Sequence, residues 1–334
     1  MVIQWFPGHM TKTLRMMDDE IKKVDGVIYV LDARAPYSSL NPEFQKRIKN
    51  KPHMYVINKC DLADDHATAL WVKHFSRDGN ICVRAISTKS GAAKEVYKKA
   101  LQLLKEKIER NRAKQVNKKM RLMVIGIPNS GKSTLINNLC GNKRAITGDK
   151  PGVTRGKQWL YVDEQMELCD TPGSLYPSFE NQKTAKNLAY IGSINDNILD
   201  KNELALEFLK TMVNIYPKML EERYKIDASK EPLEIYEQIC KNRGFLLRGG
   251  DFDYDRGAAT ILDDFRKGRT GDITLDKYYE IFGKNVATEK AVKKEKPDKK
   301  KRKFGEEVIL EVATDISSDH LSVAQMRKME EENA

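Results

Sequence analysis

The sequence contains little cysteine and no long hydrophobic run. Its five cysteines are scattered over 334 residues without any Cys-x-x-Cys spacing, which excludes a disulfide-rich secreted domain and a zinc ribbon. No stretch approaches the roughly 20 apolar residues that span a bilayer, and no apolar run of signal-peptide length stands near the N-terminus. We therefore expect a cytoplasmic protein with reduced thiols and no membrane association.

Acidic residues are in deficit. The chain carries 59 lysines and arginines against 48 aspartates and glutamates, a formal net charge of +11 and a pI near 9.2. This excess favours a polyanionic partner, because cations that neutralise phosphates gain affinity from the release of counterions. Charge alone does not distinguish RNA from DNA or from an anionic membrane. The length suffices for one sizeable α/β domain and a smaller second domain.

The most informative single motif is a glycine-rich loop at residues 126–133, Gly-Ile-Pro-Asn-Ser-Gly-Lys-Ser. The apolar run 121–125 suits a buried parallel strand, and residues 134–139 carry apolar side chains at helical spacing. The backbone N–H groups of such a loop surround a phosphate, while Lys132 reaches the β- and γ-phosphates and the Ser133 hydroxyl holds Mg²⁺. We predict phosphate contacts from Asn129, Ser130, Gly131, Lys132, Ser133 and Thr134.

Two further loops indicate that the base is guanine. Residues 58–61, Asn-Lys-Cys-Asp, follow the apolar run 54–57 at the carboxyl end of a predicted strand, where ligands bind in open α/β sheets. The Asn58 amide suits the O6 and N7 edge of guanine, and the Asp61 carboxylate accepts from N1–H and the exocyclic amine. Alone this motif is as often a simple turn. A second predicted strand, however, leads into Ser-Thr-Lys-Ser-Gly at 87–91, which resembles the loop that backs the guanine in GTPases. We predict base contacts from Asn58, Lys59, Asp61, Ser87, Thr88 and Lys89.

The order of these motifs is unusual. GTPases of the usual kind carry the phosphate loop first and the guanine loops last, whereas here the guanine loops come first, which is a circularly permuted order. Together with Trp-Phe-Pro-Gly-His-Met at 5–10 and Asp-Ala-Arg-Ala-Pro at 32–36, the chain resembles the bacterial ribosome biogenesis GTPase A (YlqF) family over roughly residues 2–284. We expect Asp32 and Arg34 to form an ion pair that fixes their loop.

The resemblance implies an α/β fold, a circularly permuted P-loop GTPase domain with a mostly parallel sheet and helices on both faces. A small all-α domain and a basic tail follow it. A long helix over 94–118 is expected to lead from the guanine loops to the phosphate-loop strand. The lysine-rich composition of the tail predicts disorder. The predicted divisions are an N-terminal motif and helix at 1–24, the GTPase domain at 25–180, a helical RNA-binding domain at 186–284 and the tail at 285–334.

The remaining nucleotide contacts follow from the family resemblance. Thr154 resembles the first-switch threonine, whose hydroxyl binds Mg²⁺ and whose N–H binds the γ-phosphate only in the triphosphate state. Asp170 and Gly173 lie in Asp-Thr-Pro-Gly, where the aspartate reaches Mg²⁺ through water and the glycine N–H contacts the γ-phosphate. The predicted metal contacts are thus Ser133, Thr154 and Asp170.

The group that orients the attacking water is not evident. Many GTPases place glutamine after this glycine, whereas this chain has Ser174. We hypothesise that residue 174 does not activate water and that His9, in the N-terminal motif, or an element of the bound partner does. The predicted catalytic set is His9, Lys132, Thr154 and Gly173. In GTPases that use K⁺ an asparagine recurs at the position of Asn129, so K⁺ is a candidate second cation; an ordinary turn residue is the equal alternative.

The C-terminal part reads as helical, with apolar side chains at helical spacing near 204–213, 233–239 and 258–265. Its basic residues are candidates for a surface that faces ribosomal RNA, although each one alone is better explained as part of a solvated helix face. The candidates are Lys241, Arg243, Arg248, Arg256, Arg266, Lys267 and Arg269.

The sequence therefore predicts a monomeric GTPase that binds GTP or GDP with Mg²⁺ and docks on the maturing large ribosomal subunit and its rRNA, without DNA or membrane. Hydrolysis would release or remodel the particle, and basal turnover would be slow without an activating partner. The principal alternative is an RNA-binding assembly scaffold in which the nucleotide is only structural. An ATP-using P-loop kinase is a third possibility, against which Asn58 and Asp61 speak.

Overall fold

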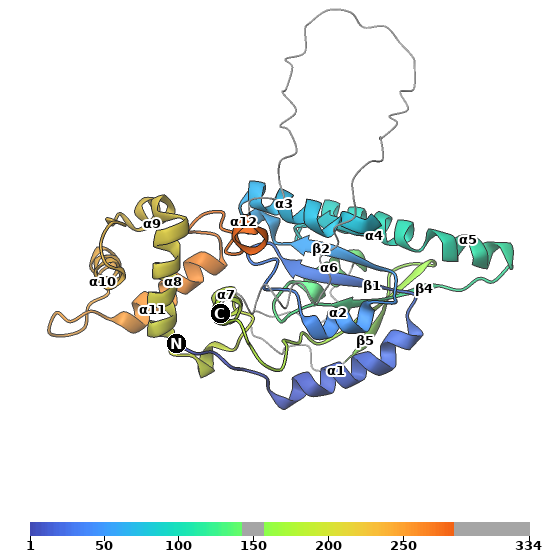
Figure 1. Ribbon diagram of the computed structural model, residues 1–334, viewed down its shortest axis with the longest axis horizontal. Coiled ribbons are helices and arrows are strands. Elements are labelled where there is room, and N and C mark those ends of the chain that lie inside the picture. The colour runs from blue at the N-terminus through green and yellow to red at the C-terminus, as the bar shows by residue number, and fades with distance from the viewer. Residues whose placement is uncertain (142–156, 284–334) are drawn as a thin grey trace, which may run out of the picture. The chain divides into compact units, whose positions relative to one another are not determined.

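The computed structural model describes residues 1–141 and 157–283, which belong to one compact unit. Within these residues a six-stranded sheet has the order β3-β2-β1-β4-β6-β5 (Figure 1). Neighbouring strands are parallel except β5, which pairs antiparallel with β6 at one edge, so the predicted mostly parallel sheet is confirmed. The strands are β1 (Gly26–Asp32), β2 (His53–Asn58), β3 (Ile81–Arg84), β4 (Met120–Ile125), β5 (Gln158–Tyr161) and β6 (Met166–Asp170).

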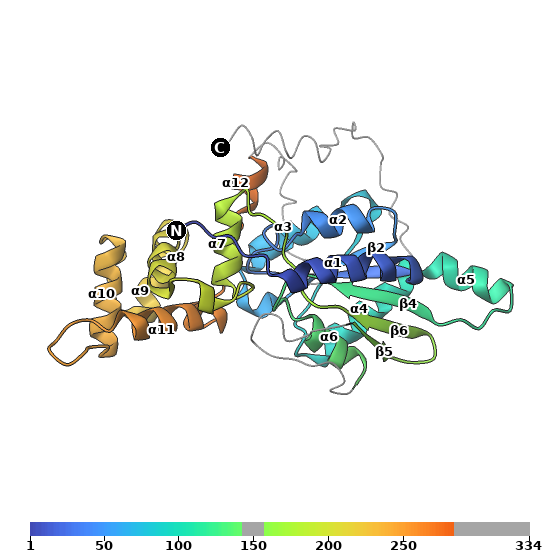
Figure 2. The same cartoon turned by 90° about the horizontal axis from the view of Figure 1, so that it is seen from below.

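Helices cover both faces of this sheet, as Figures 1 and 2 show from two directions. The central strand β1 alternates its side chains between two cores, as the period of two in a strand requires. Ile28 and Val30 pack beneath α4 and α6, whereas Tyr29 and Leu31 pack beneath α1, α2 and α3. These helices are α1 (Gly8–Glu20), α2 (Pro42–Ile48), α3 (Asp65–Phe75), α4 (Ser90–Leu103), α5 (Lys105–Ala113) and α6 (Lys132–Leu139).

A second, helical part follows β6 and has its own core. Its buried side chains include Phe208, Ile235 and Phe265, and the N-terminal Ile3 and Met10 join the same cluster. The helices are α7 (Gln182–Tyr190), α8 (Lys201–Ile215), α9 (Pro217–Tyr224), α10 (Pro232–Arg243), α11 (Tyr254–Arg266) and α12 (Tyr278–Phe282). The predicted all-α region is confirmed, although α7, α9 and α12 were not anticipated.

The helix predicted over 94–118 is wrong as a single element. It begins at Ser90, breaks at Leu104, and resumes as α5, which ends at Ala113. Leu104 is buried and has non-helical dihedral angles, φ −102° and ψ 10°; its side chain faces Gly26 at the start of β1. Because the two predicted domains lie in one compact unit, the boundary between 180 and 186 stays a prediction. The predicted tail lies outside the described residues.

The sheet order places the loops of interest side by side. β1 lies between β2 and β4, and β6 lies on the other side of β4. All four strands are parallel, so the loops that follow them share the carboxyl edge of the sheet, where ligands bind in open α/β folds. None of the described helices combines the length and apolarity needed to cross a bilayer.

Candidate nucleotide-binding site

The loop between β4 and α6 has the backbone geometry of a phosphate-binding turn. Asn129 and Gly131 have positive φ angles of 58° and 90°, and Gly131 is the N-cap of α6. Lys132 is buried and donates from Nζ to the carbonyl oxygens of Gly126 at 3.2 Å and Ile127 at 2.9 Å. Burial lowers the pKa of the Lys132 ammonium to about 8, although the charge of Asp170 opposes the shift. A phosphate bound in this turn would add a negative charge beside the Lys132 ammonium and so stabilise its protonated form.

Two predicted magnesium contacts lie together at the start of α6. The Ser133 hydroxyl donates to Asp170 Oδ2 at 3.0 Å, while Asp170 Oδ1 is buried without a hydrogen-bond partner. Burial also raises the pKa of the Asp170 carboxyl. A hard cation that favours oxygen ligands would satisfy this orphaned oxygen, so the pair fits Mg²⁺. The third predicted contact, Thr154, lies outside the described residues.

The first guanine loop is tied to its two neighbours by Asn58. Its Nδ2 donates to Ser87 Oγ at 3.1 Å and to the Ser130 carbonyl oxygen at 2.8 Å, and its Oδ1 accepts from the Ser87 N–H at 2.9 Å. Asn58 thus uses both amide hydrogens within the protein. Its geometry is that of a clamp between the guanine loops and the phosphate loop, and the expected base contact stays a prediction. Contact with N7 would require it to give up one of these bonds.

The remaining predicted base contacts lie at the surface. Asp61, Thr88 and Lys89 are exposed, whereas Thr134, a predicted phosphate contact, is half-buried in the first turn of α6. Asp61 has no hydrogen-bond or ion-pair partner among the described residues. Its carboxylate is therefore available to accept two hydrogen bonds, which matches the donor pattern of guanine N1–H and its amine.

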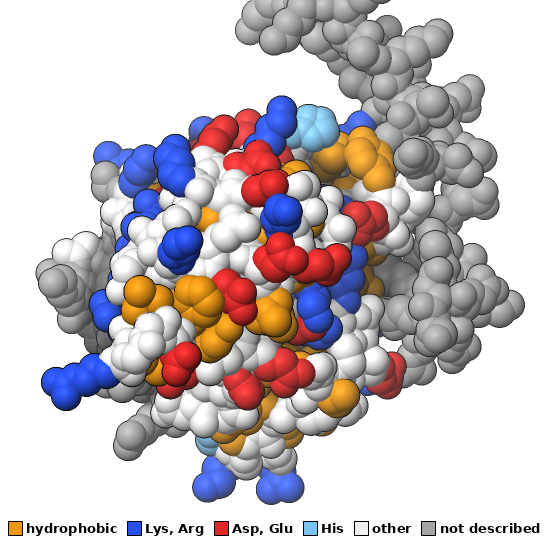
Figure 3. Space-filling view, turned by 90° about the vertical axis from the view of Figure 1, so that its left-hand side faces the viewer, with side chains coloured by type: hydrophobic (Ala, Val, Ile, Leu, Met, Phe, Trp, Pro, Cys, Tyr) orange, Lys and Arg blue, Asp and Glu red, His pale blue; other side chains and the backbone are white. Residues whose placement is uncertain are grey.

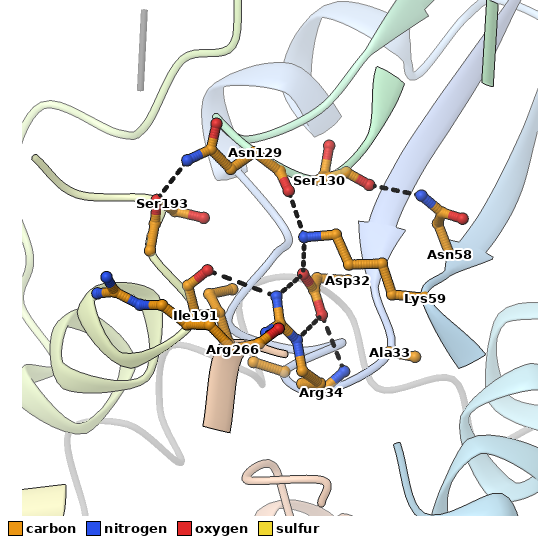
Figure 4. A network of polar contacts seen from close by, with 12 residues as sticks. Asp32, Ala33, Arg34, Asn58, Lys59, Asn129, Ser130, Ile191, Ser193 and Arg266 are labelled. Carbon is orange, nitrogen blue, oxygen red and sulfur yellow. Dashed lines mark hydrogen bonds and ion pairs between the residues drawn. The ribbon is translucent and has the colours of Figure 1, made fainter. Parts of the chain in front are cut away.

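A buried ion network connects these loops (Figure 4). The Arg34 guanidinium donates to both oxygens of Asp32, at 2.9 and 2.7 Å, which confirms the predicted ion pair. Asp32 Oδ2 also pairs with Lys59 Nζ at 3.0 Å, and Lys59 donates to the Asn129 carbonyl oxygen. The two cations hold the pKa of Asp32 well below its ordinary value despite burial. One carboxylate therefore links β1, the first guanine loop and the phosphate loop.

The same network reaches the helical region at the turn after α7. The carbonyl oxygens of residues 189–192 all accept side-chain hydrogen bonds there. Arg266 donates to the oxygens of residues 189 and 190, at 2.9 and 3.0 Å. Arg34 donates to that of residue 191 at 3.4 Å, and Asn129 to that of residue 192 at 2.7 Å. In return Ser193 donates from Oγ to the Pro128 carbonyl oxygen at 2.8 Å. The phosphate loop therefore contacts the helical region directly, without an intervening switch segment.

The Asp-Thr-Pro-Gly segment at 170–173, which we call the second switch, also lies against the phosphate loop. An added Cβ at Gly173 would come within 2.6 Å of Pro128 Cα, so the two backbones are in close contact. Ser174 is buried, and its hydroxyl donates to the Leu175 carbonyl oxygen. Met10 Sδ lies 3.4 Å from the Leu175 nitrogen and accepts its hydrogen bond. The residue after His9 thus contacts the switch, while the His9 side chain itself is exposed.

The candidate RNA-facing residues divide into two groups. Arg266 and Arg269 serve internal contacts: Arg266 pairs with Asp196 at 2.6 Å, and Arg269 pairs with the buried Asp264 at 2.6 Å. Lys267 pairs with Asp263 on α11 at 3.0 Å. The exposed members with no ion pair among the described residues are Lys241, Arg243, Arg248 and Arg256.

Sequence reasoning missed the turn after α7 because backbone carbonyls provide most of its contacts. Any residue has a carbonyl, so the sequence does not indicate which ones accept. The one signal is Gly192, which has φ 78° and lies against the Arg266 guanidinium. A glycine directly after a helix indicates a tight turn, although it does not reveal that Arg34 and Asn129 meet there.

Comparison with known proteins agrees with this geometry. Residues 121–235 match the family model described as "50S ribosome-binding GTPase". The chain is 42% identical to ribosome biogenesis GTPase A of Bacillus cereus, over 86% of this chain and 97% of that protein, and 41% identical to the protein of that name from Priestia megaterium, over 83% and 97%. The GDP-bound structure of YlqF from Thermotoga maritima has the same fold, with a TM-score of 0.58 at 23% identity over 79% of this chain and 99% of that one.

The fold and the arrangement of the loops define a circularly permuted P-loop GTPase. The guanine loops precede the phosphate loop in the chain and nevertheless meet it at the carboxyl edge of the sheet. With the identity and coverage of its relatives, the chain belongs to the ribosome biogenesis GTPase A (YlqF) family.

We predict that Gly131→Ala strongly weakens nucleotide binding. A Cβ at this residue would lie 2.2 Å from Asn58 Nδ2 and 3.3 Å from Ser87 Oγ, and φ is +90°, so the substitution strains the backbone and displaces the clamp. We expect affinity for a fluorescent GDP analogue to fall on the order of 100-fold, from the summed cost of strain and broken hydrogen bonds. Gly141→Ala is the matched control, because Gly141 has φ +65° with no atom near the added Cβ. Equal affinities of the two variants would contradict the clamp.

We also predict that GTP·Mg²⁺ binding takes up a proton just above pH 8. The pKa of Lys132 is lowered to about 8, and a bound phosphate raises it again, so the ammonium is protonated more fully in the complex than in the free protein. Uptake should approach one proton above pH 8 and vanish well below it, where Lys132 is charged in both states. Calorimetry in buffers of high and low ionisation enthalpy measures this. Absence of uptake above pH 8 would refute the role of burial.

Proposed function

We propose that this protein is a GTP-hydrolysing assembly factor that acts late in maturation of the large ribosomal subunit. In the GTP state it binds the precursor particle through rRNA, and hydrolysis releases or remodels it. The relatives named ribosome biogenesis GTPase A support the ribosomal role, and the formal charge of +11 suits an RNA partner. We further propose that it acts as a cytoplasmic monomer without DNA or membrane.

The contact between the phosphate loop and the turn after α7 is the observation that carries this proposal. A nucleotide that repositions Pro128 or Asn129 alters the bonds to Ser193 and Gly192. The turn ends α7, whose residues belong to the core of the helical region. A ligand shifts an equilibrium only through contacts that differ between two states, and these bonds supply such contacts between the nucleotide and the proposed RNA-binding helices.

The RNA surface of the helical region is proposed to consist of Lys241, Arg243, Arg248 and Arg256. Figure 3 shows the face at the end of the molecule where α10 and α11 lie, where acidic side chains border most of an apolar patch and most basic side chains lie toward the rim. Exposed Leu246 and Leu247 belong to the loop between these helices. Such a surface would contact phosphates at separate points, so we expect it to position the protein on rRNA rather than read bases.

For hydrolysis we propose that Lys132 and the Gly173 N–H stabilise charge on the γ-phosphate and that Ser133, Asp170 and Thr154 hold Mg²⁺. Magnesium held by these residues would supply positive charge to offset the charge that develops on the phosphates. The internal hydrogen bond and burial of Ser174 support the hypothesis that it does not orient water.

K⁺ is proposed as a second cation near Asn129. The positive φ of this residue brings its side chain to the rim of the phosphate loop, where its amide contacts Gly192. Equal turnover in K⁺ and Na⁺ buffers would argue against this cation.

We predict that His9→Ala slows single-turnover hydrolysis in the complex with large ribosomal subunits by about 10²-fold or more, as expected for loss of a group that orients or activates water. Ser174→Ala should stay within a few fold of the wild type, because the Ser174 hydroxyl is engaged with the Leu175 carbonyl oxygen. Chemical quench with radiolabelled GTP measures both. An unaffected His9 variant would assign the role to the partner.

We predict that large ribosomal subunits stimulate GTP turnover and co-sediment with the protein in a non-hydrolysable GTP analogue more than in GDP. Ser193→Ala should keep nucleotide affinity but reduce this GTP-to-GDP preference by about 2- to 10-fold, the value of one hydrogen bond. Ser229→Ala, an exposed serine that bonds only within its own turn, is the control. Tight subunit binding that is indifferent to nucleotide would instead support the scaffold with a structural nucleotide.

A further inference from the structure

α5 is a helix without a core of its own. None of its residues is buried, and residues 112–118 that end and follow it are all exposed. Ile108 alone packs partly against the cluster beneath α4 and α6. Figures 1 and 2 both show α5 extending past the sheet, at the end away from α8–α11. Packing therefore does not explain the composition of this segment.

The segment is strongly basic. Residues 105–121 contain eight lysines and arginines but only two glutamates. Lys107 pairs with Asp25 at 2.5 Å, Arg121 with Glu167 at 3.2 Å and Lys105 with Glu109 at 3.9 Å, so these three cations already have partners. The others leave a surplus of positive charge at the surface.

Three of these cations form what we call the α5 basic edge: Arg112, Lys114 and Lys118. All three are exposed, and no carboxylate of the described residues lies within ion-pair distance of any of them. Neighbouring exposed cations repel one another. A ligand that neutralises them therefore breaks no existing ion pair and relieves this repulsion.

The chemistry of the edge favours a nucleic-acid backbone over a membrane. An interfacial helix inserts large apolar side chains beside its cations, whereas the large exposed hydrophobic residues near this edge, among those the structure describes, are Val116 and Tyr161, neither of which lies on α5. Arg112 lies in the last turn of α5, and Lys114 and Lys118 follow in the exposed segment after it, so successive phosphates of one strand can contact the three cations. Flexible side chains without fixed neighbours suit phosphate contacts rather than base reading.

We propose that the α5 basic edge is a second RNA-backbone contact surface, separate from that of the helical region. This proposal rests on the proposed function, because the RNA that the edge contacts would be the RNA of the large ribosomal subunit. Within the described residues, the edge makes no hydrogen bond to the phosphate loop or to the turn after α7. Its contribution to binding is therefore the same in the GDP and GTP states, unlike that of the helical region.

The test compares two triple variants with equal loss of charge. The first variant removes the edge through Arg112→Gln, Lys114→Gln and Lys118→Gln. The control variant removes three exposed lysines that have no ion pair in the described part of the chain, through Lys12→Gln, Lys22→Gln and Lys49→Gln. Lys12 lies on α1, and the other two directly follow α1 and α2. Affinity for purified large ribosomal subunits and for a labelled duplex RNA is measured against KCl concentration in GDP and in a GTP analogue. All substituted residues are exposed, so both proteins should fold as the wild type does.

The edge variant should bind both probes about 10-fold more weakly or worse, and the slope of log affinity against log salt should shrink by about 2–3, from three lost phosphate contacts. The loss should be equal in both nucleotide states, and basal GTP turnover should be unchanged. An equal loss of affinity in the control triple, or no loss in the edge variant, would overturn the proposal. So would a loss of affinity seen only for anionic vesicles, measured in parallel, and for neither RNA probe. Persistent nucleotide-dependent subunit binding in that case would leave the proposed function intact.

Discussion

The buried carboxylate of Asp32 is the group on which the site depends. It lies at the carboxyl end of β1, is 1% exposed, and is paired with Arg34 and Lys59. A buried charge without its partner is costly, of order 3–5 kcal/mol when one partner of such a pair is removed. Both cations are therefore held in place, and each carries a second bond outward: Lys59 to the phosphate loop, and Arg34 to the turn after α7. One charge thus fixes three loops and the approach of the helical region.

This arrangement explains why chain order has little effect on the nucleotide site and a large effect on the segment after it. The loops meet because β1, β2, β4 and β6 lie next to one another in the sheet, and strand pairing does not depend on which strand comes first. The permutation instead determines which segment leaves the second switch. Here residues 174–181 lead directly into α7, and Gln4 bonds to Phe179 in both directions, at 3.0 Å each. The switch is therefore held between the N-terminal segment and the helical region.

Much of the site was predictable because its motifs are local. The phosphate loop, the two guanine loops and the Asp32–Arg34 pair each occupy a few consecutive residues, and their backbone geometry follows from glycine, from the strand before and from the helix after. The break at Leu104 was not predictable, since an apolar residue at helical spacing looks the same whether or not the chain bends to bury it. Arg266 was assigned to RNA because nothing in its neighbourhood shows that Asp196, far away in sequence, pairs with it.

The same consideration changes the meaning of the net charge of +11. Several cations that contribute to it, among them Arg34, Lys59 and Arg266, are engaged by carboxylates and carbonyls inside the fold. They organise the site and have little left to offer a polyanion, because binding one would first break these bonds. A surface for RNA must therefore be sought among cations that the described part of the fold leaves unpaired, and these include cations on α10 and the loop after it, at the start of α11, and at the end of α5 and just after it. The net charge counted from the sequence includes both the cations that are engaged inside the fold and the unpaired cations at the surface. Only the contacts in the structure distinguish the two.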